Sequence, residues 1–599
     1  MISVKDSVQN IRSIFAGIKF PQGLDFFLLF GFILVSALFN AFKLCGDCFY
    51  GYSITEYILH PTWYHISDLV VNGGASNFLF YRLMAYFPFF RDNFVLRDFI
   101  ISVPLTFLIV LAWYNVFYEL TRNRTLVLLS IFFLIFSDDK LNLNGYSIPF
   151  FTLTSIGSIH FLQIFALFFF LQSKYLLSLI LLALTAYIHP GSSLTYLIIL
   201  GLVLLFKAVK EKNFKIFIKP IIYSVLIIIP NLIIIKRSMS ATNFQAGEFF
   251  NIFYTLMVKL GTGHSYLETY FSRGYLYFLA LLLLLVLNQF KKIVRIEHQN
   301  EILSFIFFSV AGSLFWLANL YFIHNLSVFQ LFFVAKAFLL VKPVLILFVV
   351  LVFDNLFKRD LFAKLIAVLL CVALFTFSSW QGAVVLLVVS VYYLIEPKFK
   401  TIVPVNLLSQ SKLLTPSRIY MFTVGVVLLV GVLTFGYKFN NKLSKIYGLL
   451  RGRNQFNFSF DKSKNYIYAK ASPAYSDLVD WAKQYKGKMF IVPVFDDNFS
   501  VSFRYLTKDS IYISVFDTGQ LSYNPDIFIK AYKRMLDVGI LVTNSAGYNV
   551  SGYNMLTMEQ VKKLDVDFIV FDKISLGYNR SILIAPSFEN DKYIVYKIR

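Results

Sequence analysis

Long, nearly uninterrupted runs of apolar residues constrain this chain more than any other feature of its sequence. Phe26–Phe42 and Tyr275–Leu287 are two of them, and neither shows an amphipathic stripe. Crossing a hydrocarbon core about 30 Å thick requires apolar helices of this kind. The chain is 58% hydrophobic and 15% charged, whereas a soluble domain is about 45–50% apolar and about 25% charged. The sequence therefore predicts a polytopic α-helical membrane protein and excludes a soluble multidomain enzyme.

The apolar runs predict about thirteen transmembrane helices. Those between residues 125 and 207 are short, so they could tilt or include re-entrant pieces. The expected spans are 24–43, 98–120, 125–137, 158–173, 175–189, 192–207, 219–235, 275–290, 302–323, 338–357, 361–377, 382–395 and 418–437.

The distribution of lysine and arginine predicts the orientation of these spans. With the N-terminus in the cytoplasm, the cytoplasmic segments hold 21 Lys and Arg and the opposite loops hold nine, although those loops are longer in total. This bias follows the positive-inside rule. It predicts outer loops at 44–97, 137–157 and 236–274 and an extracytoplasmic C-terminus. The net charge of +22 is then mainly a topology signal, and we expect no nucleic-acid partner.

The N-terminal segment and the cysteines complete this description. Lys5, Arg12 and Lys19 precede an apolar run that is too long for a signal peptide, and no small-residue cleavage site follows it. We therefore expect an uncleaved first span. Cys45 and Cys48 form a single CxxC, and three cysteines in total do not make a disulfide framework.

The composition changes after about residue 440. Residues 440–599 contain 22 Lys and Arg and 15 Asp and Glu, as expected of a soluble domain. Helical and strand patterns alternate along them, which predicts a small extracytoplasmic α/β domain after a membrane domain at 1–439. Helices are expected at 473–485, 525–538 and 557–564, and strands at 489–495, 510–516, 568–571 and 593–598.

The first outer loop is the richest in candidate catalytic groups. Asp47 follows the first span directly, at the depth of a lipid phosphate, and Glu56 and Asp68 lie further along the loop. A carboxylate at that depth could act as a general base or hold a divalent cation. Alternatively, these acids cap helices in a solvated loop.

Further candidates lie at the other predicted outer ends of spans. Asp138 and Asp139 could bind a metal or terminate a span, and His189 beside Pro190-Gly191 could line a cavity that binds a phosphate or a lipid, or mark a hinge. Four basic residues could neutralise a phosphate or a lipid headgroup: Lys236, Arg237, Arg273 and Lys336. No P-loop, dinucleotide fingerprint, HExxH or paired CxxC zinc pattern is present in the sequence.

The layout resembles the GT-C superfamily of integral-membrane glycosyltransferases, especially its oligosaccharyltransferases. The resemblance rests on the inside N-terminus, on Asp47 directly after the first span, on a large late outer loop, and on an outer α/β domain after about thirteen spans. It covers nearly the whole chain as an architecture. The segment Asp477–Trp481, followed by Phe490–Pro493 and Phe503-Arg504, also looks like the tail of bacterial membrane proteins of this type. The Trp-Trp-Asp motif with which oligosaccharyltransferases hold their acceptor is absent from 440–599.

The resemblance implies transfer of a sugar or glycan from a polyprenyl (di)phosphate to an extracytoplasmic glycan, lipid or protein. In that role Asp47 would be the base or a ligand of Mg²⁺ or Mn²⁺, supported by Glu56, Asp68, Asp138 and Asp139. Lys236, Arg237 or Arg273 would neutralise the leaving phosphate. The many Lys, Asn, Ile and Phe residues favour an AT-rich bacterial genome and hence a bacterial cytoplasmic membrane.

Two other readings stay open. A surface-polysaccharide polymerase or ligase shares the lipid-linked donor but relies on arginine in its outer loops, so Arg273 would matter more than Asp47. A transporter or a non-catalytic scaffold would tolerate neutralisation of every outer-loop carboxylate. Few charges in the span centres and no obvious inverted repeat argue against a transporter.

Overall fold

Helices make up most of the described chain. The computed structural model describes residues 17–40, 46–71, 79–86, 94–136, 155–239, 246–255, 275–325, 338–375, 379–402, 473–493, 503–514, 521, 524–543, 547–549, 551–573 and 585–599. The helices of its first 402 residues are α2 (Leu24–Asn40), α3 (Gly46–Leu59), η1 (Pro61–Trp63), α4 (Leu79–Tyr86), α5 (Phe94–Thr121), α6 (Arg124–Phe136), α7 (Ser155–Leu171), α8 (Tyr175–Thr185), α9 (Pro190–Lys210), α10 (Lys215–Met239), α11 (Ala246–Phe253), α13 (Tyr275–Lys291), α14 (Gln299–Ala318), the π-helical turn η5 (Asn319–Ile323), α16 (Phe338–Phe357), α17 (Leu361–Phe375) and α18 (Ser379–Ile402).

Five stretches of helix among the described residues are long and apolar enough to cross a membrane. They are Val103–Thr121, Pro190–Lys210, Lys215–Ile233, Gln299–Ile323 and Phe338–Phe357. Seven more of the expected spans overlap a described helix that is shorter or less apolar. The thirteenth, 418–437, lies outside the described residues, so the total of thirteen stays a prediction.

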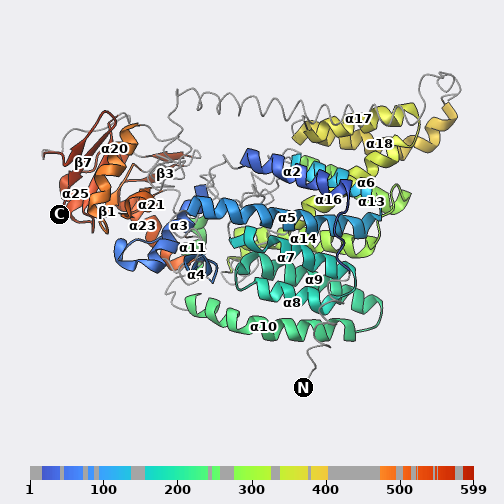
Figure 1. The fold of residues 1–599 in the computed structure, drawn as a ribbon, viewed down its shortest axis with the longest axis horizontal. Helices are drawn as coiled ribbons and strands as arrows, with labels where there is room; N and C mark the ends of the chain where they lie inside the picture. Colours follow the sequence, from blue (N-terminus) through green and yellow to red (C-terminus); the bar gives the residue numbers. More distant parts are fainter. Residues whose placement is uncertain are drawn as a thin grey trace.

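The helices of the bundle differ in burial, and α10 runs along one edge of the bundle (Figure 1). In α16, 89% of the span is buried inside the protein, against 22% in the corresponding stretch of α10. A helix that is apolar on every side belongs in a protein interior, whereas one that exposes apolar side chains outside it suits a lipid environment. Accordingly, α16 packs on α5, α6, α14 and α17, while α10 packs on α8 and α9.

A small mixed sheet forms the core of the C-terminal region, defined here as the described residues of 473–599. Its five strands lie in the order β2-β1-β5-β7-β6, with β1 parallel to β2 and β5, and β7 antiparallel to β5 and β6. A separate hairpin pairs β3 with β4. The strands are β1 (Met489–Ile491), β2 (Ser510–Ile511), β3 (Leu541–Thr543), β4 (Gly547–Asn549), β5 (Phe568–Asp572), β6 (Phe588–Glu589) and β7 (Tyr593–Lys597).

The helices of this region begin where local signals place them. They are α20 (Pro473–Ala482), η9 (Lys483–Tyr485), α21 (Arg504–Thr507), α23 (Pro525–Asp537), α24 (Ser551–Asn554) and α25 (Met558–Lys562). The Asn524 side chain caps α23 ahead of Pro525, and Thr557 with Gln560 forms a capping box on α25. The predicted helices and strands of 473–599 all coincide with described elements, although β1 and β2 are shorter than expected.

The two ends of the bundle have different neighbours. At one end, α3, α4 and α11 lie beside α21 and α23 of the C-terminal region (Figure 1). At the other end, segments rich in lysine and arginine contact one another: Glu119 lies 3.4 Å from His298, Lys207 lies 2.6 Å from Glu301, and Asn355 donates to the Ile293 carbonyl. Segments that the charge bias assigns to one side thus lie at one end of the bundle.

Candidate functional site at the joint of the first outer loop and the C-terminal region

Asp68 links the predicted first outer loop to the C-terminal region. Its Oδ1 accepts from the backbone N–H groups of Val70 (2.9 Å) and Val71 (3.4 Å), which fixes the local turn. Its Oδ2 accepts from Arg504 Nε at 2.8 Å and from the Ile511 N–H at 3.2 Å. The carboxylate is fully buried and the arginine is 5% exposed. Since a carboxylate offers about four acceptor positions, those of Asp68 are occupied by protein.

Glu56 forms a second ion pair across the same joint, by which we mean the contact between residues 46–71 and the C-terminal region. It lies in the last turn of α3, where its Oε2 accepts from Lys508 Nζ and from the Tyr64 hydroxyl. Burial raises the pKa of Glu56 and lowers the pKa of Lys508, while the attraction between the two charges opposes both shifts. Burial and the neighbouring Glu56 carboxylate also raise the pKa of the Tyr64 hydroxyl. Desolvation therefore outweighs the pairing energy here.

Aromatic and backbone contacts complete the joint. The rings of Tyr52 and Tyr505 are 5.4 Å apart, and the Lys486 ammonium lies 5.2 Å from the ring of Trp63. The backbone N–H of His65 donates to Ser510 Oγ at 2.8 Å. Salt bridges, ring contacts and hydrogen bonds together make the joint a specific interface between the two segments.

The third outer loop reaches the same region through α11. Phe249 and Phe253 on α11 pack on Phe528 of α23, with ring centroids 5.6 and 6.0 Å apart. All three rings are buried. The predicted first and third outer loops are thus both attached to the C-terminal region by buried contacts.

Asp47 lies in the first turn of α3, but its side chain is outside what the structure describes. Nine residues of helix separate its position from Glu56, which corresponds to about 13 Å along the axis and half a turn around it. The two positions therefore do not converge on one reacting centre. The joint fixes the far end of the helix on which Asp47 lies.

The other predicted site residues do not gather into one described cluster. Asp138, Asp139, Arg273 and Lys336 lie outside the described residues. Lys236 and Arg237 lie near the end of α10, and their side chains are likewise outside the description.

His189 lies at the start of a helix. It is the N-cap of α9, where its Nδ1 accepts from the backbone N–H of Ser192 at 3.2 Å. This is the structural alternative expected from His189-Pro190-Gly191. Its binding role stays a prediction.

A buried polar cluster adjoins His189. Gln163 on α7 donates from Nε2 to Ser192 Oγ at 2.8 Å and to Ser193 Oγ at 3.0 Å, and its Oε1 lies 3.4 Å from His160 Nδ1. His160 and Gln163 are fully buried, and within the described part of the chain His160 Nε2 has no hydrogen-bond partner. Burying polar side chains in an apolar bundle costs free energy. The cluster is therefore a second candidate site, on the same predicted side of the membrane as the joint.

No group of three or more His, Cys, Asp or Glu side chains suited to a metal occurs among the residues that the structure describes. The expected ligands Asp47, Asp138 and Asp139 fall outside that search because their side chains are not described. The cation therefore stays a prediction. Comparison of the chain with protein families, with curated proteins and with solved structures found no match.

The sequence predicted the acidic residues of the joint, Glu56 and Asp68, as site residues, but it did not predict their basic partners. The signals for Arg504 and Lys508 are weak, because a basic residue in a mixed polar segment is usually solvated. Gln163 was also missed, although a polar side chain one helical turn from His160 within an apolar run was visible in the sequence.

Proposed function

We propose that this chain is a membrane glycosyltransferase that moves a sugar or glycan from a polyprenyl (di)phosphate carrier to an extracytoplasmic glycan, lipid or protein acceptor. The observation that carries the proposal is the attachment of two predicted outer loops to the C-terminal region at one end of the bundle. Such an assembly is what an enzyme needs in order to hold a membrane-embedded donor beside a water-soluble acceptor. The charge bias assigns this end to the outer face of a bacterial cytoplasmic membrane.

In the proposed reaction, an acceptor hydroxyl attacks the anomeric carbon of the donor. The bond from that carbon to the phosphate oxygen breaks, and the polyprenyl (di)phosphate leaves with the electron pair. Asp47 takes the proton of the hydroxyl and releases it to water. Lys236, Arg237 or Arg273 would neutralise the leaving phosphate.

Glu56 and Asp68 are proposed to act on the site through the joint. Both carboxylates accept hydrogen bonds from basic side chains of the C-terminal region. They would hold α3, and with it Asp47, against the acceptor-facing domain. Asp68, which is fully buried and has its acceptor positions occupied by protein, would act only through the joint, and direct contact of Glu56 with the substrate stays a prediction from the sequence.

The test uses the full-length protein in liposomes with a panel of short-chain polyprenyl monophosphate and diphosphate sugars carrying glucose, mannose or N-acetylglucosamine, each offered with a glycan, a lipid and a peptide acceptor that carry free hydroxyl groups. Released polyprenyl (di)phosphate is the readout. Asp47→Asn should lower release at least about 100-fold, the typical contribution of a general base, whereas Glu559→Gln, at an exposed acid of α25, should leave it unchanged. Equal release by wild type and Asp47→Asn would remove Asp47 from the mechanism.

Two further arms address the cation and the rival functions. Loss of release in EDTA, restored by Mg²⁺ or Mn²⁺, would support a metal at Asp47, Asp138 and Asp139. A loss confined to Arg273→Ala would favour a surface-polysaccharide polymerase or ligase. The ion pairs of Glu56 and Asp68 favour one non-catalytic alternative, a scaffold whose outer domain docks partners, and no release with any donor would favour that reading.

A further inference from the structure

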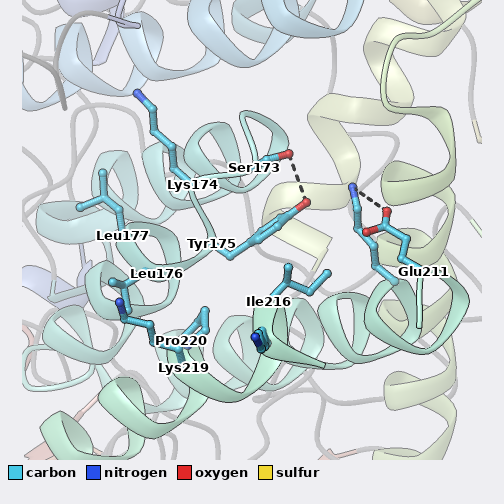
Figure 2. Close-up of a pocket in the computed structure, with 11 residues that line it drawn as sticks. Ser173, Lys174, Tyr175, Leu176, Leu177, Glu211, Ile216, Lys219 and Pro220 are labelled. Carbon is cyan, nitrogen blue, oxygen red and sulfur yellow. Dashed lines mark hydrogen bonds and ion pairs between the residues drawn. The ribbon is translucent and has the colours of Figure 1, made fainter. Parts of the chain in front are cut away.

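A pocket of about 850 Å³ opens at the end of the bundle opposite the joint. It lies between the turn that joins α7 to α8, the C-terminal end of α9 and the first two turns of α10. Figure 2 shows Ser173 and Tyr175 on the α7–α8 side, Glu211 at the α9 side, and Ile216, Lys219 and Pro220 from α10. The charge bias of the sequence assigns this end to the cytoplasm.

The lining of the pocket is strongly basic. Four lysines and one glutamate line it: Lys174, Lys207, Lys215, Lys219 and Glu211. Lys207 already pairs with Glu301 at 2.6 Å and lies 3.7 Å from Glu211. Lys215 and Lys219 are exposed, and no carboxylate of the described residues pairs with them. The pocket therefore has positive charge that the described chain does not neutralise.

The two exposed lysines begin a continuous stripe on α10. Residues four, three, four, three and four positions apart share one face of an α-helix, and this spacing runs from Lys215 through Lys219 to four aliphatic residues. Those residues are exposed by 51, 60, 40 and 46%: Ile222, Leu226, Ile229 and Ile233. One face of α10 thus changes from cationic at the pocket to apolar beyond it.

The dimensions of this stripe match one lipid molecule. From Ile222 to Ile233 the helix rises about 16 Å, close to half of a hydrocarbon core about 30 Å thick. Only 22% of this stretch of α10 is buried inside the protein, so acyl chains would cover side chains that the bundle leaves uncovered. The Tyr175 hydroxyl, which donates to Ser173 Oγ at 3.2 Å, adds the polar-tipped ring typical of a membrane interface.

We propose that this pocket binds the phosphodiester headgroup of an anionic phospholipid, with the acyl chains lying along the exposed face of α10. Lys215 and Lys219 supply the charge that recognises the phosphate, and Leu176, Ile216 and Pro220 form the apolar wall beside it. Basic pockets between helices on the cytoplasmic side suit such headgroups. The site is separate from the joint and does not depend on the proposed transferase activity.

The experiment titrates the purified full-length protein in detergent with phosphatidylglycerol or phosphatidylcholine and counts bound lipids by native mass spectrometry. The test variant is Lys215→Gln with Lys219→Gln. The matched control is Lys210→Gln with Lys291→Gln, which removes two exposed lysines of the same end that do not line the pocket. Unchanged thermal midpoints show that both variants fold, and single Lys219→Gln serves if the double variant does not.

The expected result is selective binding of phosphatidylglycerol that weakens about thirtyfold in the test variant, because both lysines that attract the phosphate lose their charge. The control variant should bind like the wild type. Equal binding by the test and control variants would overturn the proposal. Displacement of the lipid by millimolar glycerophosphate or inorganic phosphate would overturn the lipid assignment in favour of a soluble phosphate.

Discussion

The two ends of the bundle differ in how far their charged side chains are buried and paired. At the joint, Asp68 is fully buried and Glu56 is 13% exposed, and each carboxylate pairs with a basic side chain from the C-terminal region. At the pocket end, Glu211 is 48% exposed, and Lys215 and Lys219 face solvent. At the joint, Glu56 and Asp68 are thus held in buried pairs, whereas the pocket end has, beside pairs such as Lys207–Glu301, two lysines exposed to its surroundings.

This difference teaches what each end can do. A buried pair fixes the relative position of two segments, but it adds little net stability because desolvation offsets attraction. An exposed cation fixes nothing, but it is available to a ligand. We therefore expect the joint to be the sensitive end for structure and the pocket to be the sensitive end for binding.

The largest effect is expected from Arg504→Met. It leaves the Asp68 carboxylate buried without its cation, and removing one partner of a buried pair costs about 3–5 kcal/mol. Limited proteolysis of the full-length protein should show faster cleavage in 60–71 and in the C-terminal region. The combined variant with Asp68→Asn should recover part of the loss, and additive effects would show that the two residues do not couple.

An intermediate effect is expected from the pH dependence of Asp509, which lies at the joint between Lys508 and Ser510. Burial raises its pKa to about 8, and its Oδ2 has no hydrogen-bond partner within the described part of the chain. The folded state thus holds a proton that the unfolded state releases near the ordinary aspartate pKa of 3.8. The contribution of Asp509 to the stability of the folded state is therefore fully present below pH 3.8 and is lost as the pH rises towards 8.

The measurement is the thermal midpoint of the wild type and of Asp509→Asn from pH 5 to pH 9. The wild type should lose a few kcal/mol between pH 5 and pH 8, because each pH unit between the unfolded-state and folded-state pKa values costs about 1.4 kcal/mol, whereas Asp509→Asn should give a flatter profile. Asp480→Asn, at a carboxylate that is 62% exposed, is the control. Parallel profiles for wild type and Asp509→Asn would assign the pH dependence to other groups.

The smallest effect is expected at the pocket end, from a double-mutant cycle on Lys207 and Glu301. Their side chains are 21 and 19% exposed, and pairs that solvent reaches typically contribute about 1 kcal/mol or less. Thermal midpoints of Lys207→Gln, Glu301→Gln and the double variant give the coupling. A coupling as large as that of Asp68 with Arg504 would break the contrast between the two ends.

Local signals predicted much of the fold. Apolar runs located the helices of the bundle, and the alternating patterns of the C-terminal region located the helices that begin at Pro473, Pro525 and Met558. These features depend on residues that are close together in the chain. The orientation and the total number of spans stay predictions, because the described helices establish neither.

The sequence did not predict the partners of the candidate site residues. It indicated that Glu56 and Asp68 are costly to bury, but one sequence does not say which of 55 basic residues would neutralise each. The pairing depends on how β1, β2 and α21 fold, and those elements lie more than 400 residues further along the chain. The spacing of the α10 stripe is present in the sequence itself. The pocket at its start depends on how α8, α9 and α10 pack together, which the spacing does not predict.

The separation of 436 residues between Asp68 and Arg504 also has a consequence for biosynthesis. At about 5–20 residues per second, the ribosome needs about 20–90 s after making the aspartate before it makes the arginine. During that interval the predicted first outer loop has no C-terminal partner, so the joint can close only when nearly the whole chain has been made.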